Sequence, residues 1–440
     1  MDPHISYRLR RRHFLSGLTA WSAGWSSVSV LSWRSASAGP HFMQRFDFDR
    51  APGLFDPRFI HVASLYDGTA TRGRRVVAVS GDGELSSALA GARAGDDIVL
   101  TSGTYTAAHQ LTASGTASAP IRLIGASSFG SVLSGGFHVG GAYVMVLGVA
   151  FRAKAYRHTG DFGSVIACRF RDNVGNTGNP GILLQANDCH IAFNDFSMPD
   201  AVGLRMDFEG ASKCFRTRVE YNYIHDFPRP ADGHQDNGCE GIQLGTYGGD
   251  NAELDNECVI NSNLFQDCDR DDEPIAVKSA GGLLIGNHFE NCFGSISLRV
   301  TKNCIVNHNY VDGNGKGVKG IVVNGPDNIL IGNICAGDKI FRADAGNETY
   351  KTITPGEPDV ATTQRLIAES NTGNWYIGDT WQRVVYQADV DFKGPVGGTV
   401  TTSGAPTIDY LPASSPAPVS QARPLATTDV GPHALMKWLL

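Results

Sequence analysis

The sequence predicts an all-β protein whose chain is wound into a single-stranded, right-handed parallel β-helix. Three observations predict this fold. Short apolar runs of three to five residues recur roughly every 22 to 25 residues through the middle of the chain, with longer intervals where segments are inserted. Glycine is abundant, at 52 of 440 residues, and only 18% of the residues are charged, which suits short strands joined by tight turns. The third observation is an asparagine that recurs with an apolar residue two positions later, at Asn194, Asn222, Asn263, Asn287, Asn309 and Asn333.

A second series of short strands alternates with the asparagine series. Each coil of the solenoid therefore contains at least two strands, and we expect the asparagines to bond to one another in an internal ladder. The segments between strands are too short for α/β crossovers, which excludes a doubly wound fold. The strands of the second series contain Ile182, Leu204, Ile242, Ile275, Ile296 and Ile321.

The two ends of the repeat region have different sequence patterns. Residues 83–94 predict a short amphipathic helix, which would cap the open end of the solenoid. The β-helix itself is predicted over residues 83–340, and the longest insertions, near residues 227–257, are expected on its binding edge. Residues 341–440 predict an irregular C-terminal extension of strands, a strap and a Pro/Ser-rich tail.

Residues 1–38 have the pattern of an export signal. Paired arginines, Arg11 and Arg12, precede a mildly apolar region, and residues 36–38 (Ala-Ser-Ala) provide small residues for cleavage. This pattern predicts a twin-arginine signal, with an ordinary secretory signal as the alternative. We therefore expect a periplasmic or secreted protein, in which residues 39–82 form an N-terminal extension before the β-helix.

The chain is acidic, with a formal net charge of −7. Removal of residues 1–38 would take away five arginines and one aspartate, leaving 32 basic against 43 acidic residues and a net charge of −11. Such a chain is poorly suited to bind nucleic acid or an anionic membrane surface. No stretch of about 20 apolar residues after the N-terminus predicts a membrane span. We expect a monomer.

The chain has nine cysteines, an odd number, so at least one is unpaired. Cys268 and Cys292 are 24 residues apart, at equivalent positions of neighbouring repeats. This spacing favours stacked, buried thiols that fill the core, with disulfides or metal ligation as alternatives. No CxxC pair supports a zinc site.

Two basic residues, Lys278 and Arg299, are 21 residues apart, close to one repeat. Stacked coils would place them about one strand spacing (~4.8 Å) apart. Ile275 and Val277 are expected to point inward, so Lys278 points outward on the alternating strand. A solvated outer face is the simplest interpretation of such a pair. Against it, two stacked cations repel each other unless negative charge lies nearby, and the adjacent acids at 271–273 repel one another unless a cation binds them.

These residues belong to motifs that resemble those of polysaccharide lyase family 6, the chondroitinase B and alginate lyase group. The resemblance covers residues 83–337, more than half of the chain. Its motifs are a cysteine–acid turn, two acids one residue apart, a Lys-Ser five residues after the second acid, and a Leu-Arg about one coil later. In this chain they are Cys268-Asp269, Asp271 and Glu273, Lys278-Ser279, and Leu298-Arg299.

The resemblance implies a lyase that cleaves an acidic polysaccharide by β-elimination. Lys278 would be the general base, and Arg299 the acid or the stabiliser of the leaving oxygen. Asp271, Glu273 and Asn237 would be Ca²⁺ ligands, and all-oxygen ligands suit this ion. Removal of the C5 proton of a uronic acid requires neutralisation of its carboxylate, which a divalent cation can provide.

The chain departs from the family's pattern where substrate anions are usually bound. Gln243, Val300 and Val322 stand where the family commonly has arginine, histidine and arginine, and Asp271 replaces a glutamate. These departures favour alginate or another bacterial uronate polymer over chondroitin or dermatan sulfate. Arg216 and Arg218 are possible replacement contacts or solvated side chains. The candidates for substrate contact are Glu240, Gln243, Arg205, Lys213 and His308.

Two other functions are compatible with the sequence. An inverting glycosidase on the same scaffold would use paired carboxylates, about 6.5–9.5 Å apart, drawn from Asp236, Asp269, Asp271 and Asp272. A non-catalytic polysaccharide-binding or exopolysaccharide scaffold protein is the other alternative, favoured by the missing arginines.

Overall fold

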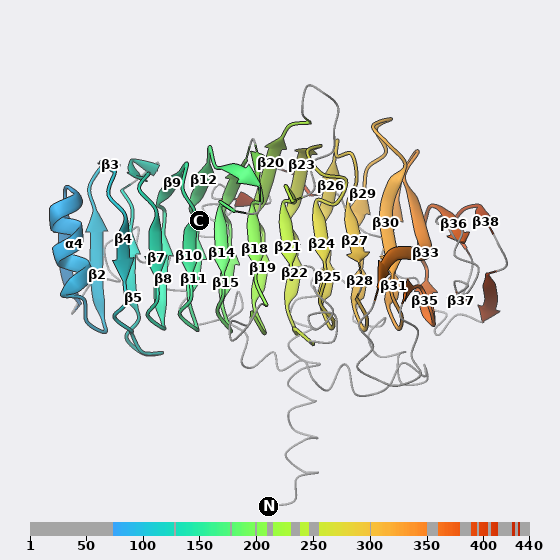
Figure 1. Ribbon diagram of the computed structural model, residues 1–440, viewed down its shortest axis with the longest axis horizontal. Coiled ribbons are helices and arrows are strands. Elements are labelled where there is room, and N and C mark those ends of the chain that lie inside the picture. Colours follow the sequence, from blue (N-terminus) through green and yellow to red (C-terminus); the bar gives the residue numbers. More distant parts are fainter. Residues whose placement is uncertain are drawn as a thin grey trace, which may run out of the picture.

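The computed structural model describes residues 74–126, 129–176, 178–198, 200–208, 214–229, 238–245, 255–299, 301–349, 360–378, 389–393, 396–403, 406–411, 425–426 and 430–431. Short strands are stacked one above another along a single long axis, as Figure 1 shows. The predicted signal segment, residues 1–38, lies outside the described residues. No helix in the described part of the chain is long and apolar enough to cross a membrane.

The strands form three long sheets that run the length of the solenoid. Sheet A has 14 strands: β1 (Arg75–Val79), β2 (Asp96–Leu100), β5 (Ile121–Ile124), β8 (Val144–Leu147), β11 (Ser164–Ile166), β15 (His190–Ala192), β19 (Arg218–Glu220), β22 (Val259–Asn261), β25 (Leu283–Ile285), β28 (Ile305–Asn307), β31 (Ile329–Ile331), β35 (Leu366–Glu369), β37 (Asp389–Lys393) and β39 (Thr407–Leu411). Sheet B has 10 strands: β3 (Gly103–Tyr105), β6 (Ser131–Leu133), β9 (Ala150–Arg152), β12 (Arg169–Arg171), β16 (Asp195–Ser197), β20 (Tyr223–Phe227), β23 (Leu264–Cys268), β26 (His288–Glu290), β29 (Tyr310–Val311) and β32 (Ile334–Cys335).

Sheet C, with 13 strands, is the sheet that positions the candidate site. Its strands are β4 (His109–Leu111), β7 (Phe137–Val139), β10 (Tyr156–His158), β14 (Ile182–Leu184), β18 (Leu204–Met206), β21 (Ile242–Leu244), β24 (Ile275–Val277), β27 (Ile296–Arg299), β30 (Lys319–Asn324), β33 (Ile340–Thr349), β34 (Val360–Thr362), β36 (Asn374–Gly378) and β38 (Val400–Ser403). A two-stranded sheet of β13 (Val174–Asn176) and β17 (Asp200–Ala201) lies outside these three.

Each full coil contributes one strand to sheet C, then one to sheet A and one to sheet B, and neighbouring coils pair in parallel. The predicted parallel β-helix is therefore confirmed. Stacking continues beyond residue 340, where the sequence periodicity fades, because β33 pairs with β30 and β35 pairs with β31. It reaches β39, which ends at Leu411.

The helix α4 (Asp82–Ala90) lies at the end of the solenoid next to β2 and β4, as Figure 1 shows in blue. Leu85 and Leu89 are buried on one side of the helix, four residues apart, and pack into the core. The predicted N-terminal cap is confirmed, although the helix ends four residues before the predicted boundary.

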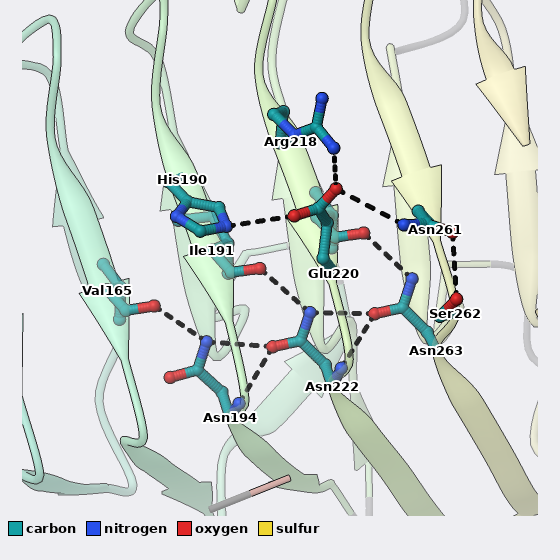
Figure 2. Close-up of polar contacts among 11 residues, drawn as sticks. Val165, His190, Ile191, Asn194, Arg218, Glu220, Asn222, Asn261, Ser262 and Asn263 are labelled. Carbon is teal, nitrogen blue, oxygen red and sulfur yellow. Dashed lines mark hydrogen bonds and ion pairs between the residues drawn. The ribbon is translucent and has the colours of Figure 1, made fainter. Parts of the chain in front are cut away.

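Inside the solenoid, the asparagine ladder forms as predicted. Asn222 donates from its side-chain amide to Asn263 Oδ1 at 2.8 Å and accepts from Asn194 Nδ2 at 2.9 Å (Figure 2). The ladder continues through the remaining predicted asparagines and then reaches Asn371, which the sequence pattern missed. Each amide satisfies backbone groups at a turn that water does not reach.

All nine cysteines are buried free thiols, so the structural interpretation of the cysteines is confirmed. Cys268 and Cys292 lie on neighbouring coils, and both are in the main core cluster. Aromatic rings stack in the same way, with Phe265 and Phe289 at 4.7 Å between centroids. Equivalent positions of successive coils therefore carry matching side chains, which keeps the register fixed.

The C-terminal residues that are described lie against the corner between sheets A and B. The backbone N–H of Leu425 is 3.1 Å from His288 Nδ1, and the backbone N–H of Gly431 donates to the carbonyl of Tyr221 at 2.7 Å. Val430 between them is buried. Contacts at residues 425 and 431 therefore tie the end of the chain to coils formed some 140 to 210 residues earlier.

Candidate active site

The predicted pair of basic residues occupies adjacent coils of sheet C. Val277 of β24 is paired with Leu298 of β27, so the residues that follow, Lys278 and Arg299, are neighbours. Val277 and Leu298 are in the core, and alternation along each strand turns the two basic side chains outward. The packing of two apolar side chains thus determines where both cations lie.

The Lys278 side chain is held by a buried carboxylate. Its Nζ lies 3.2 Å from Glu240 Oε1, and the Lys278 side chain is only 9% exposed. Gln243 Nε2 donates to the same oxygen at 3.3 Å. Glu240 and Gln243 both come from the coil that precedes Lys278; Glu240 lies just before β21 and Gln243 lies within it. The segment Glu240–Leu244 therefore supplies the immediate surroundings of the amine.

Gly245 allows the backbone that follows β21 to lie close to the backbone of Lys278. It follows β21 with φ of +84°, a conformation that favours glycine. A Cβ at this position would lie 3.1 Å from the Lys278 carbonyl oxygen. The glycine therefore lets the backbone of one coil lie directly against Lys278 on the next.

Arg299 is paired with Glu273, the second of the two predicted metal-binding acids. Arg299 Nη1 lies 3.5 Å from Glu273 Oε2, and Ser297 Oγ donates to Glu273 Oε1 at 3.1 Å. Burial raises the pKa of Glu273, while the positive charges of Arg299 and Lys278 oppose that rise. Ser297 occupies the outward position in the middle of β27, a signal that could have identified it from sequence.

Asp271 lies at the corner between sheets B and C. It accepts hydrogen bonds from the backbone N–H groups of Gly238 at 3.2 Å and Glu273 at 3.1 Å. Burial, followed by the negative charges of Glu240 and Glu273, raises the pKa of Asp271 to about 7. Three carboxylates therefore lie close enough together to disfavour each other's charge.

The donor chemistry of this acid cluster fits a hard cation. Glu240 is fully buried, and its Oε2 has no hydrogen-bond partner among the described residues. Its negative charge and those of Asp271 and Glu273 oppose one another, an effect that a bound cation would relieve. The described part of the chain contains no set of three His, Cys, Asp or Glu side chains arranged to hold a metal ion. Asn237, the third predicted ligand, lies outside the described residues.

A comparison with protein families matches residues 79–345, more than half of the chain, to the family described as Chondroitinase B. The chain belongs to the chondroitinase B family. The resemblance inferred from the acid–lysine–arginine motifs is therefore confirmed. A comparison with curated proteins found no match.

Several solved structures share this fold. A mannuronic acid specific polysaccharide family 6 lyase from human gut microbiota is 16% identical, with a TM-score of 0.62, over 77% of this chain and 82% of that chain. A family 6 polysaccharide lyase from Pseudopedobacter saltans is 17% identical, with a TM-score of 0.64, over 81% and 99%. The family 6 alginate lyase AlyGC is 19% identical, with a TM-score of 0.63, over 76% of this chain and 51% of that chain.

Within this member of the chondroitinase B family, the structure brings together Lys278, Arg299, Asp271, Glu273, Glu240 and Gln243. Arg205 lies on the same sheet, in the middle of β18, where it pairs in register with Gln243. Its Nη2 is 3.8 Å from Asp207 Oδ1. Lys213 lies outside the described residues.

Other predicted substrate contacts lie on different faces. His308 is buried at the turn between β28 of sheet A and β29 of sheet B, whereas Lys278 follows a strand of sheet C. Arg216 pairs with Asp188, and Arg218 with the buried Glu220 on sheet A. These three residues do not lie beside Lys278, because the chain has left sheet C before it reaches each of them.

Two lysines that the sequence reasoning missed partner the remaining acids. Lys316 Nζ donates to Asp269 at 2.7 Å, and Lys319 forms an ion pair with Asp272. Both acids lie in the turn that precedes β24. Lys316 precedes β30 and Lys319 is its first residue, two coils later. The local sequence GKGVKG did not indicate these partners, which precede it by two coils.

Proposed function

We propose that this protein is a Ca²⁺-dependent polysaccharide lyase that cleaves a uronic-acid-containing polymer, alginate-like in composition, by β-elimination. The observation that carries the proposal is the pairing of Val277 with Leu298, which places Lys278 and Arg299 side by side next to a cluster of acids. Membership of the chondroitinase B family supports the same reaction class.

In this proposal Lys278 takes the C5 proton of the uronic acid through its neutral amine. Arg299 donates a hydrogen bond to the oxygen that leaves from C4 and stabilises its developing negative charge. The bond between C4 and that oxygen breaks as the C4–C5 double bond forms. The leaving oxygen takes up a proton to become a hydroxyl and Lys278 returns the C5 proton to solvent, so no water is consumed.

Asp271 and Glu273, with Asn237, would hold Ca²⁺. Glu240 lies close enough for its negative charge to act on the same site. When bound, this ion supplies the positive charge that neutralises the carboxylate of the sugar. The acids remain as carboxylates, and Arg299 stays in contact with Glu273 at the edge of the same cluster.

The proposed substrate is a non-sulfated uronate polymer. Gln243 and Val322 occupy outward positions of sheet C. An arginine at either position would bind a further anion of the substrate, but neither residue is an arginine in this chain. Structural relatives with TM-scores above 0.5 are described as mannuronic acid specific or as alginate lyases, and one is an alginate lyase in complex with G6. These descriptions favour alginate for this chain as well.

An inverting glycosidase is a weaker proposal. It needs one carboxylic acid to protonate the leaving oxygen. Of its candidate residues, Asp269 and Asp272 form ion pairs with Lys316 and Lys319 and so are already engaged by protein cations. Asp236 lies outside the described residues. Asp271 has the raised pKa that a general acid needs, but among these candidates it has no described acid partner free to act as the base.

The site of action is proposed as periplasmic or extracellular, on the basis of the twin-arginine pattern in residues 1–38. Fractionation of cells that express the full chain, compared with a variant in which Arg11 and Arg12 are both lysine, tests this assignment. Retention of the variant in the cytoplasm is expected. Export of both proteins through the same route would contradict the twin-arginine assignment.

The reaction is tested with purified protein on alginate, polymannuronate, polyguluronate, pectate and glucuronan, with added Ca²⁺ or with EDTA. A lyase generates the ultraviolet absorbance of an unsaturated uronate, whereas a hydrolase generates only new reducing ends. We expect absorbance with an alginate substrate and its loss in EDTA. Binding without any product would favour the non-catalytic alternative, and reducing ends without absorbance would favour the glycosidase.

A further inference from the structure

We propose that Glu240 is the positioning residue of Lys278: its carboxylate holds the amine in place and stabilises the ammonium that forms during proton abstraction. This inference rests on the proposed function, in which Lys278 is the base. It replaces the sequence-based expectation that Glu240 contacts the substrate.

Burial separates Glu240 from any substrate. The residue is 0% exposed, and it precedes β21 at the inner side of the corner between sheets B and C. Its backbone carbonyl accepts from Gly203 N–H at 3.0 Å, which anchors it to the preceding coil. The only described donors to its side chain, Lys278 and Gln243, both belong to the protein.

Gln243 fixes the orientation of this carboxylate. Its Nε2 donates to the same Glu240 oxygen that faces Lys278, so Oε1 accepts from two side chains at 3.2 and 3.3 Å. β21 pairs directly with β24, the strand that leads into Lys278. Gln243, on the same coil as Glu240, therefore holds the carboxylate so that it faces the Lys278 amine on the next coil.

The charge balance of the reaction gives this contact a role. Before the reaction the neutral amine donates an N–H to Glu240, which leaves its lone pair available to the sugar. As the C5–H bond breaks, the proton goes to Nζ, its electron pair enters the sugar, and the amine becomes a cation. Glu240 stays ionised throughout, so its attraction to Nζ is stronger in the transition state than before it. The buried aspartate of a Ser-His-Asp triad acts on its histidine in the same way.

The test compares Glu240→Gln and Gln243→Leu with Glu290→Gln. Glu290 is the matched control, because it also accepts from a glutamine, Gln266, but lies on the outer face of sheet B. Two quantities are measured: kcat and KM on the best uronate polymer, and the rate at which an amine-acylating reagent modifies Lys278, read by peptide mass spectrometry.

For Glu240→Gln we expect kcat to fall roughly 10- to 100-fold with KM changed less than about twofold, because a charge-assisted contact to the base is lost. Modification of Lys278 should accelerate on the order of tenfold, since the amine is released. Gln243→Leu should change both quantities in the same direction but less. Glu290→Gln should match the parent protein in both.

A rise in KM with unchanged kcat would overturn the proposal and return Glu240 to a substrate contact. Unchanged modification of Lys278 in Glu240→Gln would overturn it as well, since Glu240 would then not hold the amine. If the parent protein cleaves no uronate polymer, the proposed function fails. The modification rates still decide whether Glu240 restrains Lys278.

Discussion

Val277 of β24 and Leu298 of β27 are paired in sheet C, and this contact between two buried side chains places Lys278 next to Arg299. Each of the two basic side chains contacts its own acid, Glu240 for the lysine and Glu273 for the arginine. The proposed catalytic roles of Lys278 and Arg299 therefore depend on the register in which β24 and β27 pair.

Replacement of Lys278 by alanine should reduce kcat about 100- to 10 000-fold, the usual contribution of a general base. Loss of the amine also removes the partner of a buried carboxylate, so the melting temperature should be measured alongside. Lys393→Ala, on sheet A, is the control and should retain parental turnover. A Lys278→Ala variant that still produces unsaturated uronate would exclude this residue as the base.

The stabilisation by Ca²⁺ should increase with pH. Burial and neighbouring acids raise the pKa of Asp271 to about 7, so without metal the folded protein binds this proton more tightly than the unfolded chain does. Stability in EDTA therefore falls as pH rises from the ordinary aspartate range through about 7. Ca²⁺ binds the ionised form, so its effect on Tm should be small near about pH 5 and large near about pH 8.

Calorimetry in EDTA and in excess Ca²⁺ at both pH values measures this difference. Asp271→Asn removes the titrating group, so the variant should show a smaller Ca²⁺ effect with little dependence on pH. An equal Ca²⁺ shift in the parent protein at the two pH values would contradict the placement of the ion at Asp271.

Substitution of one asparagine in the ladder should be costly. Asn263 donates to the Val219 carbonyl and to Asn287, and accepts from both the backbone and the side chain of Asn222. Asn263→Ala leaves several of these buried groups unsatisfied and should reduce the free energy of unfolding by about 2–5 kcal/mol. The midpoint of urea unfolding measures this loss. The exposed Asn374 is the control, and an equally small shift for both variants would show that the ladder contributes little.

Acid should destabilise the protein through Glu220. Burial raises the pKa of this carboxyl, but the charge of Arg218 and the hydrogen bond with His190 more than offset burial and lower the pKa to about 2 (Figure 2). The stabilisation is therefore present above the ordinary glutamate range and is lost as pH falls toward about 2.

Glu220→Gln should lower stability at neutral pH by about 3–5 kcal/mol, because it removes the negative charge that pairs with the buried Arg218. The variant should also lose less stability than the parent between about pH 4.5 and about pH 2, as measured by urea unfolding across that range. Glu290→Gln is again the control. Parallel acid profiles for parent and Glu220→Gln would contradict a role for this carboxylate.

The repeat made most of the central architecture predictable. Inward positions such as Ile275 and Val277 follow from alternation, and the asparagine ladder follows from its spacing. Asn371 escaped the pattern because Gly373, rather than an apolar residue, stands two positions after it, and because β33 and β34 lengthen the interval to 38 residues. Where extra strands are inserted between two coils, the number of residues between two positions no longer predicts how close they lie in space.

The polar contacts of the site were less predictable than its position. Lys316 and Lys319 reach acids 47 residues earlier, across two coils, and nothing local to either lysine indicates that partner. His308 was misplaced for the opposite reason. It lies only nine residues after Arg299, but those residues turn a corner and carry the chain to another sheet.

The nine buried thiols have a practical consequence. They are spread from Cys168 to Cys335, and burial raises the pKa of most of them, of Cys168 and Cys335 to about 12. Alkylating reagents should therefore ignore the native protein and mark a cysteine only when its own segment opens. Timed alkylation, followed by mass spectrometry of each cysteine-containing peptide, would record the order in which segments of the solenoid unfold. No engineered label would be needed.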